Sequence, residues 1–500
     1  MENSIGYKEL AELIGKRYDI SDRAPVLKHL CWDSRKANPS SVFFCIVGAI
    51  SDGHDYALAA YMNGCRVFVC ERRPAGLPSD ALVIIAKDGT RTALAEVAAE
   101  FYGHPEREMT LIGITGTKGK TTTACLIRSL LGKCGTEIGY IGTNGVEFLN
   151  YHYDTVNTTP ESCEIFFYLA LMKDCGVNIA VIEASSQALL LDRLHGITFE
   201  VCAFTNLSPD HIGLHEHPSY ENYRECKLKL FSEHCMGTAV VNIDSEEAPA
   251  FISAAQGAKA RVITCSCEGK AADFCADIIK SEKATTSPTS TFICTDRSGS
   301  VEIRLPLPGD YNVSNALLAF AVCSLFTDKR ESLVKAFSDA KVRGRFESFV
   351  SEGVTYIIDY AHNGASLHAV LAALRECRPK RLICLFGSVG GRTFSRRGQL
   401  AKAAADLADT VIVTSDNPDE EDPEKIIDDI CAALPRGTEY FRIADRAEAI
   451  RFAVRNAHSG DMVLLAGKGH ENYQLIRGEK VPFCEAEIVR EACAEKAAKV

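Results

Sequence analysis

Hydrophobic positions along the chain follow two alternating patterns. Short runs rich in β-branched residues are typical of buried strands, whereas the stretches between them place apolar residues at every third or fourth position, as helices do. The alternation predicts mostly parallel sheets covered by helices on both faces, which is an α/β fold. The predicted strands are 42–47, 65–71, 81–86, 109–115, 177–184, 200–206, 239–243, 261–265, 355–360, 381–386, 410–414 and 462–466.

A chain of 500 residues is too long for one hydrophobic core, and its length suggests about three domains. Predicted helices at 7–14 and 90–102 complete a small N-terminal α/β unit, which Gly103-His104-Pro105 ends. We therefore expect domains at 1–107, 108–340 and 341–500, the last of them again alternating strand and helix.

The segment 109–132, MTLIGITGTKGKTTTACLIRSLLG, predicts a strand, a glycine-flanked turn and a helix. In this context, backbone N–H groups and the helix N-terminus bind polyphosphate, Lys120 contacts the outer phosphates, and the Thr121 hydroxyl holds Mg²⁺. The usual G-x-x-x-x-G-K-[ST] pattern is shortened, because Ile114 occupies its first glycine position. A glycine turn that merely caps a core helix is the alternative. The segment favours nucleotide binding through Gly116, Thr117, Lys118, Gly119, Lys120, Thr121 and Thr122.

Polar residues follow successive predicted strands of the central region. Glu183 and Ser185 come after one strand, the TNLSPDH segment that contains His211 comes after the next, and Thr-Thr-Pro-Glu at 158–161 precedes both. Ligands of parallel α/β sheets gather at the carboxyl ends of the strands. Each group alone could be a capping device, but together they predict a site in which Glu183 and His211 hold magnesium, although His is less usual for Mg²⁺ than oxygen ligands are.

Composition excludes several classes of protein. The net charge of −11 argues against nucleic acid as a partner, and the polar N-terminus with no long apolar stretch argues against secretion or membrane insertion. The 21 cysteines lack paired C-x-x-C spacing and are expected to be buried, reduced residues. A metal or redox site at Cys265 and Cys267 is disfavoured, since no second ligand pair lies nearby. We expect a cytoplasmic enzyme that acts as a monomer.

The chain resembles the Mur ligase family over essentially its whole length. A set of motifs carries the resemblance, and as a set it is specific. The motifs are DSR (33–35), GTKGKTT (116–122), TTPES (158–162), EASSQ (183–187), TNLSPDHIG (205–213), CKLKLF (226–231), YNVSNALLA (311–319), RGRFE (343–347), DYAHNGASL (359–367), SDNPDEEDP (415–423) and AGKGHENYQ (466–474).

The resemblance implies a small N-terminal UDP-binding domain, a central ATPase domain and a Rossmann-like C-terminal domain that binds an amino acid. Within the family, the motifs resemble those of the enzymes that add the third residue of the peptidoglycan stem. The implied reaction activates the D-glutamate γ-carboxylate of UDP-N-acetylmuramoyl-L-alanyl-D-glutamate with ATP and two Mg²⁺ ions. An acyl phosphate forms, and the amine of a diamino acid then displaces phosphate.

The family also implies roles for individual residues. Lys227 matches a lysine whose carbamate, derived from CO₂, helps to hold the second Mg²⁺, so that the implied catalytic and metal residues are Lys120, Thr121, Glu183, His211 and Lys227. Positions that match ATP-binding residues are Asn312, Arg345, Asp359 and His362. Positions that match residues for the UDP-muramoyl dipeptide are Ser34, Thr158, Thr159, Ser185 and Arg193, and the amino-acid site would comprise Arg392, Asp416, Asn417, Asp419, Gly467 and Glu471.

The identity of the amino acid depends on one departure from the family. Members that add meso-diaminopimelate carry Asp-Asn-Pro-Arg, whose arginine pairs with the distal carboxylate, but this chain has Asp419 at that place. An aspartate repels a carboxylate and attracts an ammonium group, so we expect L-lysine first and L-ornithine second. Arg392 and Glu471, which match residues of the diaminopimelate enzymes, leave meso-diaminopimelate open.

Two other functions compete with this interpretation. Folylpolyglutamate synthetase shares the phosphate loop and the ligation chemistry, but it has no place for the DSR segment or for GKGHE. A nucleotide-binding protein without catalysis would not need Lys120, Glu183, His211 and Lys227 together. Phosphate release distinguishes these alternatives: an active Mur ligase of this type should release phosphate from ATP only when both the nucleotide dipeptide and the diamino acid are present.

Overall fold

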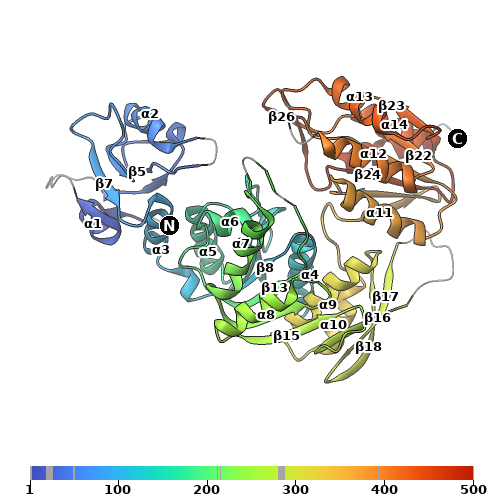
Figure 1. The fold of residues 1–500 in the computed structure, drawn as a ribbon, viewed down its shortest axis with the longest axis horizontal. Coiled ribbons are helices and arrows are strands. Elements are labelled where there is room, and N and C mark those ends of the chain that lie inside the picture. The colour runs from blue at the N-terminus through green and yellow to red at the C-terminus, as the bar shows by residue number, and fades with distance from the viewer. Residues whose placement is uncertain are drawn as a thin grey trace. The chain divides into compact units, whose positions relative to one another are not determined.

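The computed structural model describes residues 3–17, 26–48, 51–210, 212–213, 216–279, 288–391 and 394–498. The chain forms two compact units, Met1–Cys265 with Leu318–Asp328, and Ser266–Leu317 with Lys329–Val500. Each unit contains α/β layers of its own (Figure 1).

The first part of unit 1 is a small sheet with the strand order β2-β7-β6-β5-β4. Adjacent strands of this sheet pair in parallel, except that β2 pairs with β7 in the antiparallel sense. Successive side chains of β5 and β6 face opposite sides, so that Phe44 and Val69 join the core under α1 and α3 while Phe43 and Phe68 pack towards α2. The elements are α1 (Tyr7–Ile14), β2 (Gly15–Arg17), β4 (His29–Cys31), β5 (Ser41–Phe44), α2 (Ala57–Met62), β6 (Val67–Cys70), β7 (Leu82–Ala86) and α3 (Thr90–Phe101).

The central sheet of unit 1 has the order β11-β10-β9-β12-β8-β13-β14-β15, with β8 in its middle. The strands from β9 to β15 pair in parallel, whereas β10 and β11 form antiparallel hairpins at the edge. The strands are β8 (Thr110–Thr115), β9 (Ile138–Gly142), β10 (Gly145–Phe148), β11 (Tyr151–Tyr153), β12 (Ile179–Glu183), β13 (Phe199–Phe204), β14 (Cys235–Asn242) and β15 (Arg261–Ser266).

Helices cover both faces of this sheet (Figure 1). On one face, α7 packs tightly against the sheet at Gly113. A Cβ atom there would lie 3.0 Å from the Phe199 ring and 3.1 Å from the Leu230 side chain of α7. A larger residue on β8 would therefore push α7 off the sheet. The helices are α4 (Lys120–Lys133), α5 (Ser162–Asp174), α6 (Ser186–Leu190), α7 (Tyr220–Ser232) and α8 (Ala248–Gly257).

Unit 2 contains an antiparallel run, β16 (Phe274–Ile279), β17 (Ser290–Asp296) and β18 (Gly299–Leu305), and the helix α10 (Arg330–Phe337). The helix α9 (Asp310–Cys323) is divided, and its residues from Leu318 on belong to unit 1. Its last sheet has the order β19-β20-β24-β21-β22-β23, parallel except for β19. The further elements are β19 (Glu347–Ser351), β20 (Val354–Asp359), α11 (Gly364–Glu376), β21 (Leu382–Phe386), α12 (Ser395–Leu407), β22 (Thr410–Val413), α13 (Pro423–Ala433), β23 (Tyr440–Arg442), α14 (Arg446–Asn456), β24 (Met462–Ala466), β25 (Tyr473–Ile476), β26 (Glu479–Pro482) and α15 (Glu485–Ala497).

The α/β class is confirmed, with a small first sheet, a central parallel-rich sheet and a separate last sheet. Each predicted strand exists within a few residues of its expected limits. The strands β9–β11 at 138–153, β16–β18 at 274–305, and the shorter β2, β4, β19, β23, β25 and β26 were not predicted. The boundaries at residues 107 and 340 stay predictions. All 21 cysteines lie in the described part of the chain and are free thiols, most of them buried.

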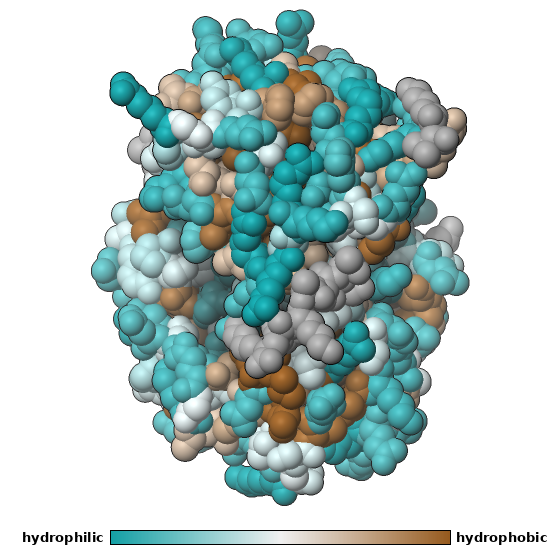
Figure 2. All heavy atoms as spheres, turned by 90° about the vertical axis from the view of Figure 1, so that its right-hand side faces the viewer, coloured by the Kyte–Doolittle hydropathy of each residue, from teal (hydrophilic) through white to brown (hydrophobic). Residues whose placement is uncertain are grey.

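Hydrophilic side chains dominate the face shown in Figure 2, and apolar ones form small groups between them. Among the described helices, none combines the length and the apolar character needed to cross a bilayer.

Candidate active site

The predicted phosphate loop lies where the pattern placed it, between β8 and α4. Gly119 precedes the helix with φ 89°, a left-handed conformation that suits glycine. At Gly116 the loop approaches the next strand end so closely that a Cβ atom would lie 1.9 Å from the Thr205 hydroxyl oxygen. The loop therefore needs both glycines, and it leads directly into the N-terminus of α4, a position that binds anions.

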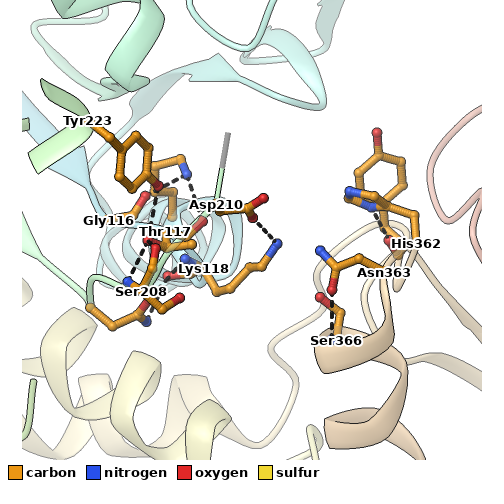
Figure 3. A network of polar contacts seen from close by, with 12 residues as sticks. Gly116, Thr117, Lys118, Ser208, Asp210, Tyr223, His362, Asn363 and Ser366 are labelled. Atoms are coloured by element: carbon orange, nitrogen blue, oxygen red, sulfur yellow. Dashed lines mark hydrogen bonds and ion pairs between the residues drawn. The ribbon is translucent and has the colours of Figure 1, made fainter. Parts of the chain in front are cut away.

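The TNLSPD segment after β13 holds this loop in place (Figure 3). Asn206 accepts hydrogen bonds from the N–H groups of Thr117, through its carbonyl at 2.8 Å, and of Lys118, through Oδ1 at 3.0 Å. The Thr117 hydroxyl lies 3.0 Å from the hydroxyl of the buried Tyr223 and 3.1 Å from the carbonyl oxygen of Ser208. Lys118 forms an ion pair with Asp210 at 2.9 Å. Hydrogen bonds and an ion pair thus join the two strand ends.

Two lysine side chains meet at the carbonyl oxygen of Gly116. Lys120 Nζ donates to it at 2.8 Å and to the Thr117 carbonyl at 3.2 Å, and Lys227 Nζ from α7 donates to the same Gly116 oxygen at 2.8 Å. Lys227 is almost completely buried, and burial, followed by the charge of Lys120, holds its pKa well below the usual value of about 10.4. The structure therefore brings these two predicted catalytic lysines together.

Glu183, at the end of β12, is fully buried and accepts several hydrogen bonds. Tyr140 Oη donates to its Oε1 at 2.5 Å and the N–H of Thr143 does so at 3.1 Å, while the hydroxyls of Thr121 and Thr143 donate to Oε2 at 3.0 and 3.2 Å. The carboxylate and the phosphate-loop hydroxyl are thus in direct contact. Oxygen atoms of this kind suit Mg²⁺, which proteins commonly hold with one or two carboxylates plus substrate phosphates.

Burial, followed by the Glu183 charge, raises the pKa of Tyr140 well above its usual value. Tyr140 and Thr143 were not predicted as site residues. Their signal was the Thr143-Asn144-Gly145 sequence between two short apolar runs, because Asn-Gly is typical of a hairpin turn. No group of three or more His, Cys, Asp and Glu side chains that could hold a metal occurs among the described residues. The Glu183 carboxylate and the Thr121 hydroxyl, which are in contact, fit a cation that is shared with a bound phosphate.

The polar residues before α5 and α6 lie beside Glu183. Thr159 Oγ1 donates to the carbonyl of Glu183 at 2.5 Å and to Ser185 Oγ at 3.1 Å, and Thr158 Oγ1 lies 3.1 Å from the Thr143 hydroxyl. Arg193 Nη1 donates to the carbonyl oxygen of Thr159 at 3.0 Å. The structure thus brings these predicted substrate residues to the carboxyl ends of β12 and β9.

Ser34 begins a short 3₁₀ turn in the first sheet's domain, where Asn63 Nδ2 donates to its carbonyl oxygen at 2.9 Å. Asp33 accepts from the N–H of Arg35 and from its guanidinium, at 2.8–3.0 Å. This pairing fixes the shape of the DSR turn. Within the described residues, no hydrogen bond joins Ser34 to Thr158, Thr159 or Ser185.

Unit 2 brings three of the predicted ATP-site residues together. Asp359 is buried at the end of β20, where its Oδ2 accepts from the N–H of Phe346 at 2.9 Å and its Oδ1 from that of Ala361 at 2.8 Å. Burial raises its pKa, whereas the charge of Arg345 acts in the opposite direction. The Arg345 guanidinium lies over the Tyr360 ring at 4.8 Å, and His362 Nδ1 lies 2.9 Å from the Tyr360 carbonyl oxygen. Asn312 Nδ2 donates to the carbonyl oxygen of Pro308 at 2.8 Å.

The predicted amino-acid residues form a second group in unit 2, at the ends of β22 and β24. Asn417 Nδ2 donates to Glu471 Oε2 at 2.9 Å, and the fully buried Lys468 donates to both side chains, at 2.8 and 2.9 Å, while lying 3.6 Å from Asp416. Lys468 was not predicted as a site residue, although it stands inside the GKGHE motif. At Gly467 a Cβ atom would lie 2.7 Å from Asp416 Oδ2. Glu471 therefore already has a cationic partner within the protein.

Asp419 has a structural task in addition to its charge. Its Oδ1 accepts a hydrogen bond from the N–H of Gly478 at 2.9 Å, and its carbonyl oxygen accepts one from the N–H of Arg477 at 2.9 Å. The residue thereby joins the SDNPD loop to the turn between β25 and β26. The predicted site residues His211 and Arg392 lie outside the described residues.

Family models and relatives complete this description. Residues 114–323 match the model of the Mur ligase middle domain, and residues 344–469 match that of the Mur ligase glutamate ligase domain. A protein of Chlorobaculum tepidum named UDP-N-acetylmuramoyl-L-alanyl-D-glutamate--2,6-diaminopimelate ligase is 39% identical over 493 residues, which cover 97% of this chain and 95% of the relative. The chain belongs to the Mur ligase family. The resemblance predicted from the motifs is thus confirmed at the level of the family.

Solved structures of Mur ligases share the fold. A structure of UDP-N-acetylmuramoyl-L-alanyl-D-glutamate--2,6-diaminopimelate ligase is 28% identical, with a TM-score of 0.66 and 99% coverage of both chains. A Mycobacterium tuberculosis folylpolyglutamate synthase complexed with ADP is 17% identical, with a TM-score of 0.63 over 75% of this chain and 91% of that one. The second likeness shows the fold alone.

Proposed function

We propose that this Mur ligase is the ATP-dependent enzyme that joins a diamino acid to the D-glutamate γ-carboxylate of UDP-N-acetylmuramoyl-L-alanyl-D-glutamate. The carrying observation is the 39% identity over 97% of the chain to a relative whose name specifies this nucleotide dipeptide as the acceptor. The alternative of a nucleotide-binding protein without catalysis is disfavoured by the shared contacts of Lys120, Lys227 and Gly116 and of Thr121 and Glu183.

The phosphate loop supports the first half of this reaction. In the proposed mechanism, the loop residues from Gly116 to Thr122 bind the ATP phosphates, chiefly through N–H groups at the start of α4, because those of Thr117 and Lys118 already donate to Asn206. Lys120 leaves its carbonyl partners to contact the phosphate that is transferred. The γ-carboxylate then attacks that phosphorus, its bond to ADP breaks, and an acyl phosphate forms. Two anions must approach each other, so positioning and positive charge lower the barrier.

Thr121 and Glu183 would hold Mg²⁺ at this site, and the ion would supply positive charge to the phosphate oxygens. The 3.0 Å contact between the Thr121 hydroxyl and the Glu183 carboxylate supports this assignment. Both groups are oxygen ligands, and they lie close enough together to bind the same cation. His211, the other proposed ligand, follows directly after Asp210.

Lys227 would carry a carbamate that holds a second Mg²⁺. The neutral amine is the form that attacks the carbon of CO₂, and loss of a proton then gives the carbamate anion. Deep burial and the neighbouring charge of Lys120 favour the neutral form, as the lowered pKa of Lys227 indicates. An amine in the same place cannot bind Mg²⁺ as an oxygen ligand does.

The remaining residues would position substrates. Ser34 would contact the nucleotide end of the acceptor, while Thr158, Thr159, Ser185 and Arg193 would contact its dipeptide end. In unit 2, the residues proposed for the ATP are Asn312, Arg345, Asp359 and His362, and those proposed for the amino acid are Arg392, Asp416, Asn417, Asp419, Gly467 and Glu471. The amine of the amino acid attacks the acyl carbon, phosphate leaves, and the amide forms.

The amino acid that we propose is 2,6-diaminopimelate, because the names of the relatives specify it. L-Lysine, which the sequence favoured, is not supported by those names. It remains the second candidate for one reason: Asp419 places a negative charge on the SDNPD loop where an arginine would pair with a distal carboxylate.

Ligation with each amino acid in parallel tests the proposal. The purified protein is incubated with ATP, Mg²⁺, the nucleotide dipeptide and one of meso-diaminopimelate, L-lysine or L-ornithine, and the product mass is determined. The proposal expects the tripeptide with meso-diaminopimelate, at a kcat/KM at least about tenfold above that with L-lysine, or ~1.4 kcal/mol in transition-state binding. The reverse preference would select L-lysine, and no tripeptide with any of them would refute the ligase assignment.

A further inference from the structure

One carboxylate in unit 1 is shared by two arginines from different parts of the chain. Arg91 Nη1 lies 2.9 Å from Glu161 Oε2, and Arg193 Nε lies 3.0 Å from Glu161 Oε1. The three side chains are 11–17% exposed, so water screens them little. Arg91 belongs to α3, in the predicted N-terminal domain, whereas Glu161 and Arg193 lie in the predicted central domain. The cluster therefore connects the two domains.

The position of Arg91 is unfavourable for its own helix. It lies in the first turn of α3, where the helix dipole presents its positive end and disfavours a cation. Its Nη2 also donates to the carbonyl of Val47 at 3.4 Å, and its buried Nε has no hydrogen-bond partner among the described residues. Helix stability therefore does not explain an arginine at position 91, whereas the ion pair with Glu161 does explain it.

Glu161 in turn fixes Arg193. Burial lowers the pKa of Arg193, and the charge of Glu161 offsets this effect. Arg193 Nε is within ion-pair distance of Glu161 but has no hydrogen-bond partner among the described residues. Arg193 Nη1 donates to the carbonyl of Thr159, whose hydroxyl donates to the carbonyl of Glu183 and to Ser185. A continuous series of contacts therefore runs from Arg91 to the rim of the central sheet.

We infer that Arg91 is a positioning residue for the acceptor substrate: through Glu161, it fixes Arg193 and holds the N-terminal domain at a constant distance from the dipeptide site. The inference rests on the proposed function, in which the acceptor spans both domains. A substrate with its nucleotide end at Ser34 and its peptide end at Arg193 binds more weakly when either of these residues shifts. ATP at the phosphate loop contacts neither residue, so its binding is unaffected.

Kinetics of Arg91→Met test this inference. Methionine keeps the length and the apolar stem but removes the ion pair. We expect the KM of the nucleotide dipeptide to rise about tenfold, equivalent to ~1.4 kcal/mol, while the KM of ATP stays within about twofold. Arg91→Lys restores the charge without the fork geometry and should recover part of the loss. It also serves as the test variant if the methionine protein does not fold.

Two comparisons distinguish positioning from general damage. Arg107→Met is the matched control. Arg107 also forms an ion pair, with its Nε 3.5 Å from Glu106, but its side chain is 70% exposed, so the pair contributes little. Both KM values of this variant should stay within about twofold of the wild type. In a Glu161→Gln background, Arg91→Met should add less than about twofold, since its route to Arg193 is already broken. Effects equal to those of the control, an equal rise in the KM of ATP, or additivity with Glu161→Gln would each overturn the inference.

The proposed function and this inference fail in different ways. If the wild-type protein forms no tripeptide, the proposed function fails, and calorimetric titration with the nucleotide dipeptide alone then measures the Arg91 effect as a change in Kd. If the wild-type protein is active and Arg91→Met behaves as the control does, only the inference fails.

Discussion

Tyr140→Phe removes one of the contacts that hold Glu183 and, with it, the acceptor that the Tyr140 hydroxyl offers to the N–H of Asn144 at 3.2 Å. The tyrosine is fully buried and its hydroxyl donates to Glu183 Oε1 at 2.5 Å, whereas phenylalanine fills the same volume without this donor. Thr121 and Thr143 keep their bonds to the carboxylate, so it stays partly satisfied. A hydrogen bond to a charged group contributes about 1.5–3 kcal/mol. We expect unfolding of unit 1 to become easier by about 2 kcal/mol, and kcat to fall because Glu183 loses its orientation.

Calorimetry and steady-state kinetics measure these effects. For a domain of 150–250 residues, about 2 kcal/mol corresponds to a Tm lowered by roughly 4–8 °C. Tyr168→Phe is the matched control, because this half-buried tyrosine contacts the rings of Tyr153 and Phe167 and has no hydrogen bond from its hydroxyl within the described residues. If Tyr140→Phe shifted Tm and kcat no more than this control does, the reasoning about Glu183 would be refuted.

The same tyrosine gives a pH dependence with a definite sign. Its pKa is raised in the folded protein, whereas an unfolded tyrosine ionises near pH 10. Its contribution to stability is therefore fully present below about pH 10 and is lost as the pH rises further. Denaturant titrations between pH 8 and 11 should show a smaller alkaline loss in Tyr140→Phe than in the wild type, and equal losses would contradict the burial argument.

Three further substitutions have defined outcomes. Lys120→Ala should abolish tripeptide formation with Tm nearly unchanged, since the lysine acts on the transferred phosphate; normal turnover would refute its role. Lys227→Ala should lose most activity and regain part of it with short carboxylic acids, and mass spectrometry of the gently handled wild type should show the carbamate; full activity in the variant would contradict that assignment. Asp419→Asn keeps the acceptor for Gly478 but removes the charge, so the ratio of kcat/KM for diaminopimelate to that for L-lysine should rise; an unchanged ratio would show that the charge does not act on the substrate.

Local patterns predicted those parts of the site that depend on local chemistry. The strand, glycine turn and helix around Lys120 have a strong periodicity and a specific loop, and the structure reproduces them. Glu183 was expected at the end of a strand, because ligands of parallel sheets gather at the carboxyl ends of strands. The structure pairs that strand, β12, in parallel with β8 beside the loop. Lys227 could be selected only by resemblance, since helical spacing would assign a lysine to the solvent face.

Long-range contacts could not be predicted. The hairpin that carries Tyr140 and Thr143 is short and glycine-rich, so its apolar pattern is weak. Lys468 stood in a recognised motif, but its burial between Asn417 and Glu471 depends on a strand pairing distant in sequence. The contact of Arg91 with Glu161 joins residues 70 positions apart, and no spacing rule indicates it. The monomeric state and the cytoplasmic location stay predictions.

Release of phosphate with each substrate omitted in turn tests the central claim most directly. The protein is mixed with ATP, Mg²⁺, the nucleotide dipeptide and meso-diaminopimelate, and phosphate is followed continuously. The proposed mechanism predicts steady release only in the complete mixture, with one tripeptide formed for each phosphate, because the acyl phosphate turns over only when an amine attacks it. Equally fast release from ATP alone, or release without tripeptide, would contradict the assignment of this chain as an amide-forming ligase.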